Sequence, residues 1–220
     1  MNGGPSLVPS NINSYIEALI PKRTSIIEEM EQYAYINHVP IMDLISAEAI
    51  LQLLRIIKPK RILEIGAAIG YSSIRMAEAL PSTEIVTIER HQERYDKALE
   101  FIAKAEKNKQ IEILFGDALE LVSTAIQKGP YDVIFIDAAK GQYKRFFQNY
   151  EPAIANGGVI ITDNVLFKGL VVEDRIENRR RRQLVDKIRV YNEWLMSNPG
   201  YDTTIIPVGD GVAISKKRDV

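Results

Sequence analysis

Apolar runs alternate with helical patterns along most of the chain, beginning at about Pro59. Five short runs have the length and the residue types of buried strands. They cover residues 61–66, 84–89, 111–117, 131–137 and 157–164. Between them lie longer segments such as 93–107, where apolar side chains recur at helical spacing. This alternation is typical of a parallel sheet wrapped by helices, so the sequence predicts a doubly wound α/β core.

The two ends of the chain depart from this alternation. Near the C-terminus, residues 203–217 contain two β-rich runs separated by Gly209-Asp210-Gly211, which predicts an antiparallel hairpin closing the sheet. Before Pro59 there is no strand-like run, but there are two helical patterns, at about 12–35 and 43–57. We therefore expect a helical cap at residues 1–58 that packs on a core at residues 59–220.

Composition narrows the chemistry that this fold can use. The 220 residues are 46% hydrophobic and 26% charged, and their formal net charge of -1 provides no global basic field to capture nucleic acid. The chain has no cysteine and only two histidines, which excludes thiolate chemistry and disfavours zinc sites and Ser-His-Asp triads. It shows no signal peptide, and no apolar run approaches the roughly 20 residues needed to cross a bilayer. We expect a soluble, cytoplasmic protein that works with oxygen and amine groups.

Ligands of open α/β sheets bind beyond the carboxyl ends of the strands. The first predicted strand ends in E-x-G-x-x-x-G, with Gly66 and Gly70, and not in the G-x-G-x-x-G motif that holds a dinucleotide pyrophosphate. This spacing favours a nucleoside without phosphates. Glu89 ends the second strand about twenty residues later, where it can accept ribose hydroxyl hydrogens. Asp117 and Ala118 follow at the place of an adenine edge, although a tight turn and a solvated strand-end charge are open alternatives.

Oxygen-bearing side chains also end the next two strands. Asp137 and Lys140 follow the fourth strand, and Asp163 and Asn164 end the fifth. Two carboxylates that close would repel each other unless a cation lay between them, and a small set of hard oxygen ligands favours Mg²⁺ or Mn²⁺. Such a cation would repel the ammonium of Lys140 and help it to act as a base. The alternative is that these residues only cap helices or form turns.

Together these motifs resemble the cation-dependent class I O-methyltransferases, which include catechol and caffeoyl-CoA O-methyltransferases and bacterial relatives. The resemblance covers most of the chain and is carried by residues 62–73, 136–140, 157–164 and 207–211. It implies an α/β, Rossmann-like class I methyltransferase fold. In that fold a mostly parallel seven-stranded sheet has an antiparallel C-terminal hairpin and an N-terminal helical cap.

The resemblance also implies an S-adenosylmethionine donor and a divalent cation, Mg²⁺ or Mn²⁺. The implied donor-binding residues are Met42, Gly66, Ser72, Glu89, Asp117, Ala118 and Asp137. The implied metal ligands are Asp137, Asp163 and Asn164, and Lys140 is the implied catalytic base. Met42 could also be a core methionine. Ala138 and Ala139 depart from the bulky residues of catechol-type enzymes, which disfavours a catechol acceptor.

Two kinds of acceptor offer the adjacent oxygens that this chemistry needs, namely a catechol-like or phenolic small molecule and 5-hydroxyuracil. The sequence most resembles a bacterial subset of the family that methylates 5-hydroxyuridine at the wobble position of tRNA, giving 5-methoxyuridine. A basic tract that contains Arg179, Arg180, Arg181 and Arg182 and continues to Lys187 and Arg189 follows the predicted metal ligands. These arginines could grip phosphates beside a looped-out base. A solvated helix face or a dimer contact is the alternative.

We expect tRNA as the partner, no membrane partner, and a homodimer, which the resemblance implies. A non-catalytic module that binds S-adenosylmethionine or RNA is disfavoured because Lys140 and all three metal-ligand positions are present. An NAD-dependent oxidoreductase is disfavoured by the glycine spacing and by the terminal hairpin. The sequence therefore predicts metal-assisted methylation of an oxygen.

Overall fold

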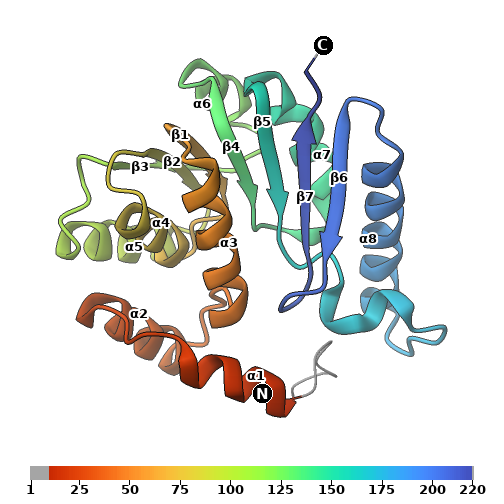
Figure 1. Ribbon diagram of the computed structural model, residues 1–220, viewed down its shortest axis with the longest axis horizontal. Coiled ribbons are helices and arrows are strands. Elements are labelled where there is room, and N and C mark those ends of the chain that lie inside the picture. The colour runs from red at the N-terminus through yellow and green to blue at the C-terminus, as the bar shows by residue number, and fades with distance from the viewer. Residues whose placement is uncertain (1–9, 220) are drawn as a thin grey trace.

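The computed structural model describes residues 10–219, which are arranged around one twisted sheet (Figure 1). The strand order is β3-β2-β1-β4-β5-β7-β6. β1 to β5 are parallel, and β7 pairs antiparallel with both β5 and β6. The strands are β1 (Arg61–Ile65), β2 (Glu84–Glu89), β3 (Ile111–Phe115), β4 (Tyr131–Ile136), β5 (Ile154–Thr162), β6 (Tyr201–Ile206) and β7 (Val212–Lys217). The predicted seven-stranded α/β fold with an antiparallel hairpin is confirmed.

Several strand boundaries differ from the predicted ones by one to three residues, most clearly those of β3 and β5. β3 ends at Phe115 rather than at residue 117, because Gly116 has a φ of +147° that leaves the strand conformation. β5 begins at Ile154 rather than at residue 157, and its pairing with β4 is irregular before Val133. The early part of β5 contains asparagine and two glycines, which are poor strand formers, so the pattern did not indicate it.

Helices cover both faces of the sheet and create two apolar cores. They are α4 (Tyr71–Ala79), α5 (Gln92–Lys104), α6 (Val122–Gln127), α7 (Tyr143–Tyr150) and α8 (Arg179–Ser197), with short 3-10 helices at Lys140–Gln142, Glu151–Ala153 and Phe167–Val172. Neighbouring residues of β1 serve different cores, since Ile62 packs with Ile74 of α4 and Leu63 packs with Phe147 of α7. Side chains alternate across a strand. A central parallel strand therefore has to be apolar at nearly every position, which explains the unbroken runs.

Between residue 10 and β1 the structure has three helices, and not the two predicted. They are α1 (Ser10–Leu19), α2 (Ser25–Ile36) and α3 (Leu44–Ile57). The predicted helix at 12–35 is wrong around Pro21, because proline has no N–H to donate and disfavours a helical Ile20 before it. Ile27 and Met30 of α2 are fully buried in the core that α4 shares. The division into a cap at 1–58 and a core stays a prediction, and residues 1–9 lie outside the described residues.

The parallel strands deliver the predicted site residues to one edge of the sheet. Backbone hydrogen bonds continue past the strand ends, since Gly66 N–H donates to the carbonyl of Ile88 at 3.0 Å. Asp137 N–H donates to Ile65 and Asp163 N–H to Ile136, both at 3.0 Å. The positions at this edge are therefore fixed by the sheet itself. No helix within residues 10–219 has the length and apolar character that spanning a membrane requires.

The loop after β1 predicts a large effect of a single methyl group. A Cβ at Gly66 would lie 2.1 Å from the carbonyl oxygen of Asp137, and its φ of +105° disfavours any side chain. We expect Gly66→Ala to lower the free energy of unfolding by roughly 3 kcal/mol or more, measured by chemical denaturation. Gly200→Ala is the matched control, because its Cβ would meet nothing nearer than 3.4 Å. Equal stability of the two variants would contradict this account of the edge.

Candidate active site

Glu89 holds the glycine loop in place through its carboxylate. Oε2 accepts from the N–H of Ala68 at 2.8 Å, and Oε1 accepts from the N–H of Arg90 and of His91 at 2.9 and 2.7 Å. The side chain of Glu89 is buried. A carboxylate has about four lone-pair directions, and Glu89 uses three of them for these hydrogen bonds. One direction on Oε2 is left for a ligand hydroxyl. The sequence did not indicate this second role of Glu89 as a support for the loop.

Glu64 is a buried carboxyl to which the sequence analysis assigned no function. The hydroxyls of Ser72, Ser73 and Thr87 all donate to it. Burial raises the pKa of Glu64 to about 7, and the three hydroxyls oppose this shift. Because the single hydrogen of the Ser72 hydroxyl points to Glu64, Ser72 offers lone pairs to a ligand and suits a donor such as an ammonium group. The sequence signal that could have indicated a role for Glu64 is its position as a charged residue in the middle of an apolar strand.

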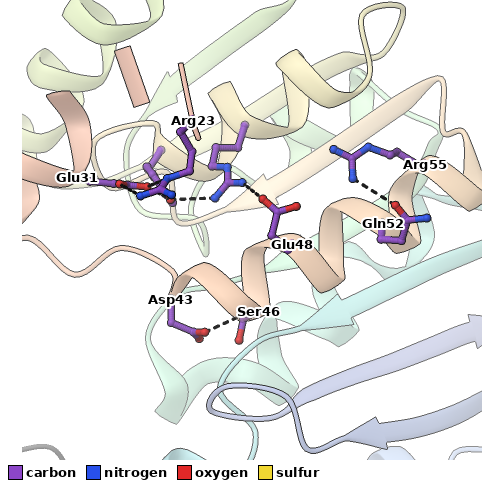
Figure 2. A network of polar contacts seen from close by, with 9 residues as sticks. Arg23, Glu31, Asp43, Ser46, Glu48, Gln52 and Arg55 are labelled. Carbon is purple, nitrogen blue, oxygen red and sulfur yellow. Dashed lines mark hydrogen bonds and ion pairs between the residues drawn. The ribbon is translucent and has the colours of Figure 1, made fainter. Parts of the chain in front are cut away.

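The structure brings the predicted donor residues Met42 and Ser72 together on the wall of one small cavity. Phe135 of β4 also lines that cavity. Met42 is 9% exposed, so the core-packing alternative describes its surroundings as well as donor contact does. The segment that carries Met42 ends in Asp43, whose side chain accepts from the N–H of Ser46 at 2.9 Å and caps α3 (Figure 2).

A network of polar contacts fastens α2 and α3 to α4 beside this cavity (Figure 2). The guanidinium of Arg75, which is 6% exposed, pairs with Glu48 of α3 and donates to the Tyr71 hydroxyl at 3.0 Å. That hydroxyl donates to Glu31 of α2 at 2.9 Å, and Glu31 also accepts two hydrogen bonds from Arg23, at 3.0 and 2.8 Å. Burial raises the pKa of Tyr71 to about 12. The helices around Met42 therefore form a fixed wall.

The predicted adenine edge lies beyond β3, next to Glu89. The carboxylate of Asp117 lies 3.4 Å from the guanidinium of Arg90, which directly follows Glu89. Ala118 is buried, and its carbonyl accepts from the hydroxyl of Tyr150. These contacts keep Asp117 and Ala118 at the strand end beside Glu89, as an adenosine site requires.

Asp137, which is half-buried, and Asp163, which is buried, form a pair of carboxylates beside Lys140. Burial raises the pKa of Asp137, and the charge of Lys140 opposes this shift. Burial also raises the pKa of Asp163 well above its ordinary value, and the charge of Asp137 raises it further. Asp163 is 1% exposed; its Oδ1 accepts from the N–H of Asn164 at 2.7 Å, whereas its Oδ2 has no hydrogen-bond partner within residues 10–219. Lys140 Nζ donates to the side-chain oxygen of Asn164.

This donor set fits a hard divalent cation. The described part of the chain contains no group of three or more His, Cys, Asp and Glu side chains placed to bind a metal. The predicted set has two carboxylates, and its third member is the amide oxygen of Asn164. An unpaired oxygen on a buried carboxylate, next to a second carboxylate, calls for a positive partner. The ammonium of Lys140 supplies one positive charge against the two negative charges of Asp137 and Asp163. A further cation would therefore balance the remaining negative charge.

The loop after Asn164 forms the other wall beside Lys140. Asn164, Phe167 and Lys168 have φ values of +58°, +43° and +56°, in the left-handed region that costs on the order of 1 kcal/mol for a residue with a side chain. The ring of Phe167 lies with its centroid 5.9 Å from Lys140 Nζ. Residues held this way persist only where the surrounding structure enforces them, and they cluster at functional sites.

Sequence reasoning missed two further residues at this edge. The Tyr143 hydroxyl donates to the carbonyl of Asp163 at 2.8 Å and so supports the acidic pair from behind. Its position three residues after Lys140 was the available signal. Asp210, in the hairpin turn, is partly buried; burial raises its pKa, and the charges of Lys168 and Lys140 oppose this shift. The glycines around Asp210 indicated only the turn.

The four predicted RNA contacts form the first turn of α8. Arg179, Arg180, Arg181 and Arg182 are all exposed, and within residues 10–219 none of their side chains has a hydrogen bond or an ion pair. Positive charge at a helix N-terminus is unfavourable by about 0.3–1 kcal/mol per residue. The Asn178 side chain caps the helix by accepting from the N–H of Arg181 at 3.0 Å. The turn is thus formed despite its charge and presents that charge to solvent.

Comparison with known proteins places this geometry in a family. The family model described as O-methyltransferase matches residues 18–218. A caffeoyl-CoA O-methyltransferase of Arabidopsis thaliana is 33% identical over 172 residues, which are 75% of this chain and 66% of that enzyme, so the chain spans about two thirds of the relative's length. The chain belongs to the O-methyltransferase family.

Solved structures agree with this assignment. A Staphylococcus aureus protein provisionally assigned as a caffeoyl-CoA O-methyltransferase is 40% identical and has a TM-score of 0.89, covering 96% of this chain and 100% of that one. The O-methyltransferase TomG of Streptomyces achromogenes, solved in complex with S-adenosylmethionine, is 26% identical with a TM-score of 0.82, covering 94% and 96%. Neither comparison identifies the methyl acceptor of this chain.

The unpaired oxygen of Asp163 predicts that this carboxylate destabilises the metal-free protein. A carboxyl whose pKa is raised on folding contributes stability below its unfolded pKa and loses it as the pH rises through the folded pKa. In chelator at pH 8 we expect Asp163→Asn to raise Tm by about 2–6 °C, for a gain of roughly 1–2 kcal/mol. The gain should shrink toward pH 4, where the wild-type carboxyl is protonated.

Calorimetry at both pH values measures this effect. Mg²⁺ should raise the Tm of the wild type at pH 8 and leave Asp163→Asn unchanged. Asp96→Asn, at an exposed position of α5, is the matched control. A lower Tm for Asp163→Asn in chelator would show that protein groups alone stabilise the carboxylate.

Proposed function

We propose that this chain is a Mg²⁺-dependent, S-adenosylmethionine-dependent O-methyltransferase that converts 5-hydroxyuridine at the tRNA wobble position to 5-methoxyuridine. The observation that carries the proposal is the carboxylate pair of half-buried Asp137 and buried Asp163. Within residues 10–219 the Oδ2 of Asp163 is unpaired, and the pair lies beside Lys140 and one loop away from the exposed arginine turn 179–182. Such a reaction takes place in the cytoplasm.

The donor side of the proposal is supported by the glycine loop and its neighbours. The remaining lone-pair direction of Glu89 suits one ribose hydroxyl, and Asp117 with Ala118 suits the adenine edge. Ser72 can accept from the ammonium of the donor's methionine part, because its own hydrogen goes to Glu64. TomG, which shares the fold, was solved with S-adenosylmethionine.

On the acceptor side, Asp137, Asp163 and Asn164 would hold the cation. When bound, Mg²⁺ would supply charge that makes an acceptor hydroxyl more acidic. In its neutral amine form, Lys140 takes the proton from that hydroxyl and becomes an ammonium, and the ring of Phe167 lies beside it. The acceptor oxygen then forms a bond to the methyl carbon of the donor. The carbon–sulfur bond breaks, its electron pair stays on sulfur, and S-adenosylhomocysteine leaves as a neutral thioether.

The arginine turn supports a polyanionic acceptor. Four exposed guanidinium groups, which have no hydrogen bond or ion pair within residues 10–219, can meet phosphates on either side of a base that enters the site. In 5-hydroxyuracil the hydroxyl lies beside a carbonyl, which provides the two adjacent oxygens. A small catechol-like or phenolic acceptor is the second candidate, and the names of the curated relatives favour it. A coenzyme A ester would also bring phosphates to the same turn.

A methylation assay with tRNA that contains 5-hydroxyuridine tests the proposal. Labelled S-adenosylmethionine should transfer its methyl group to the wobble nucleoside, and chelator should stop the reaction. The double variant Asp163→Ala with Asn164→Ala should lose turnover and keep its affinity for S-adenosylhomocysteine, as measured by calorimetry.

The affinity for tRNA should fall steeply with salt. Arg180→Gln should reduce the slope of log affinity against log salt concentration by about 1. Faster methylation of caffeoyl-CoA than of tRNA, or turnover in chelator, would contradict the proposal.

We also propose that the chain forms a homodimer through α1. Ile12, Tyr15, Ile16 and Leu19 lie at helical spacing and are 45%, 68%, 37% and 65% exposed, and the helix carries only one charged residue, Glu17. An apolar stripe of this kind on a short helix needs a protein surface to cover it. Sedimentation should show a dimer for the wild type and a monomer for Leu19→Glu, whereas Asn11→Glu, at an exposed polar position of α1, should stay dimeric. A monomeric wild type would contradict this arrangement.

A further inference from the structure

The loop that carries Phe167 is held from α8 by one arginine. The guanidinium of Arg189 donates through Nε to the carbonyl of Val171 at 2.8 Å and through Nη2 to the carbonyl of Glu173 at 2.7 Å. Asn192 lies one turn further along the same face of α8 and donates to the carbonyl of Val165 at 2.8 Å. Two side chains of one helix face thus hold both ends of the segment 165–173.

The hairpin turn holds the same segment from its other side. The N–H of Val165 donates to the carbonyl of Gly211 at 3.0 Å, and the N–H of Leu166 donates to the carbonyl of Asp210 at 2.9 Å. Between these contacts and Arg189 lie Phe167 and Lys168, both in the left-handed region. A strained stretch of this kind keeps its conformation only while its flanks are fixed. Arg189 fixes the C-terminal flank.

The arginines at the start of the basic tract differ from Arg189 in their contacts with the protein. Within residues 10–219 the side chains of Arg179 to Arg182 have no hydrogen bond or ion pair, whereas Arg189 donates through Nε and Nη2 to loop carbonyls and has Nη1 3.4 Å from Asp186. A guanidinium has five N–H donors in a fixed fork, which suits two carbonyls at once. The guanidinium of Arg189 therefore binds the loop, although in the sequence Arg189 belongs to the same basic tract as the phosphate-binding candidates.

We propose that Arg189 is a positioning residue that clamps the segment 165–173, so that Phe167 stays beside Lys140 and the acceptor meets a formed wall, and that it does not bind phosphate. The acceptor part of this inference rests on the proposed function. The clamp itself rests on the two hydrogen bonds to Val171 and Glu173. Loss of the clamp should loosen the wall without reaching the donor pocket, which is built from other elements.

Arg189→Gln tests the clamp through hydrogen exchange of the loop. The N–H of Gly169 and of Glu173 donate to the carbonyls of Leu166 and Leu170 at 3.0 and 3.2 Å, and we expect both to exchange about tenfold faster in the variant. Arg189→Lys should give an intermediate rate, because one ammonium serves the two carbonyls less well. Arg55→Gln, an exposed arginine of α3, is the matched control and should leave these amides unchanged.

Kinetics separate the clamp from a phosphate contact. For Arg189→Gln we expect KM of the acceptor to rise by about tenfold, with unchanged affinity for S-adenosylhomocysteine and an unchanged salt slope. Arg180→Gln should instead lower the slope. Unchanged loop exchange in Arg189→Gln, or a slope that falls as in Arg180→Gln, overturns the inference. If tRNA proves not to be methylated, the proposed function fails, and the exchange rates still decide whether Arg189 is the clamp.

Discussion

The charge of two neighbouring carboxylates, one buried and one half-buried, is the constraint around which this edge of the sheet is built. Asp137 and Asp163 end neighbouring strands, and the charge of Asp137 contributes to the raised pKa of Asp163. Burial removes part of the water that would otherwise screen them, so solvent weakens their repulsion less than it would at an exposed site. The protein sets one ammonium, that of Lys140, against two negative charges. The site is therefore selective for positive charge before any ligand enters it.

The sheet prevents the pair from relaxing apart. The backbone of each aspartate is hydrogen-bonded to the strand beside it, and the hydroxyl of Tyr143 holds the carbonyl of Asp163 from the helical layer. Separation of the two aspartate backbones would break these bonds, which are expensive to lose. A rigid backbone thus maintains an electrostatically unfavourable arrangement, which is how binding sites for cations are commonly stabilised.

The two sides of the site are supported in different ways. The donor side is framed by fixed contacts: the carboxylate of Glu89 on backbone N–H groups, the hydroxyls around Glu64, and the ion-paired network between α2, α3 and α4 (Figure 2). The acceptor side is a loop with residues in the left-handed region, held by α8 and by the hairpin turn. A donor shared by a whole family suits a rigid pocket, and an acceptor that differs between members suits a loop whose shape its supports determine.

The sequence by itself determined the strands and the edge at which the chemistry lies. Buried parallel strands are mostly apolar on both faces, and polar residues such as Glu89 and Asp137 appear mainly where a strand leaves the core, so spacing indicates them. Glu64, inside β1, is the exception. Pro21 is a signal for a break between two helices. The apolar pattern continues across it, however, and led to the prediction of a single helix. Only the tertiary structure decided the partners of long side chains. Arg180 and Arg189 belong to one basic tract, yet one meets solvent and the other meets loop carbonyls, because the position of a loop against a helix depends on contacts between distant segments and not on local spacing.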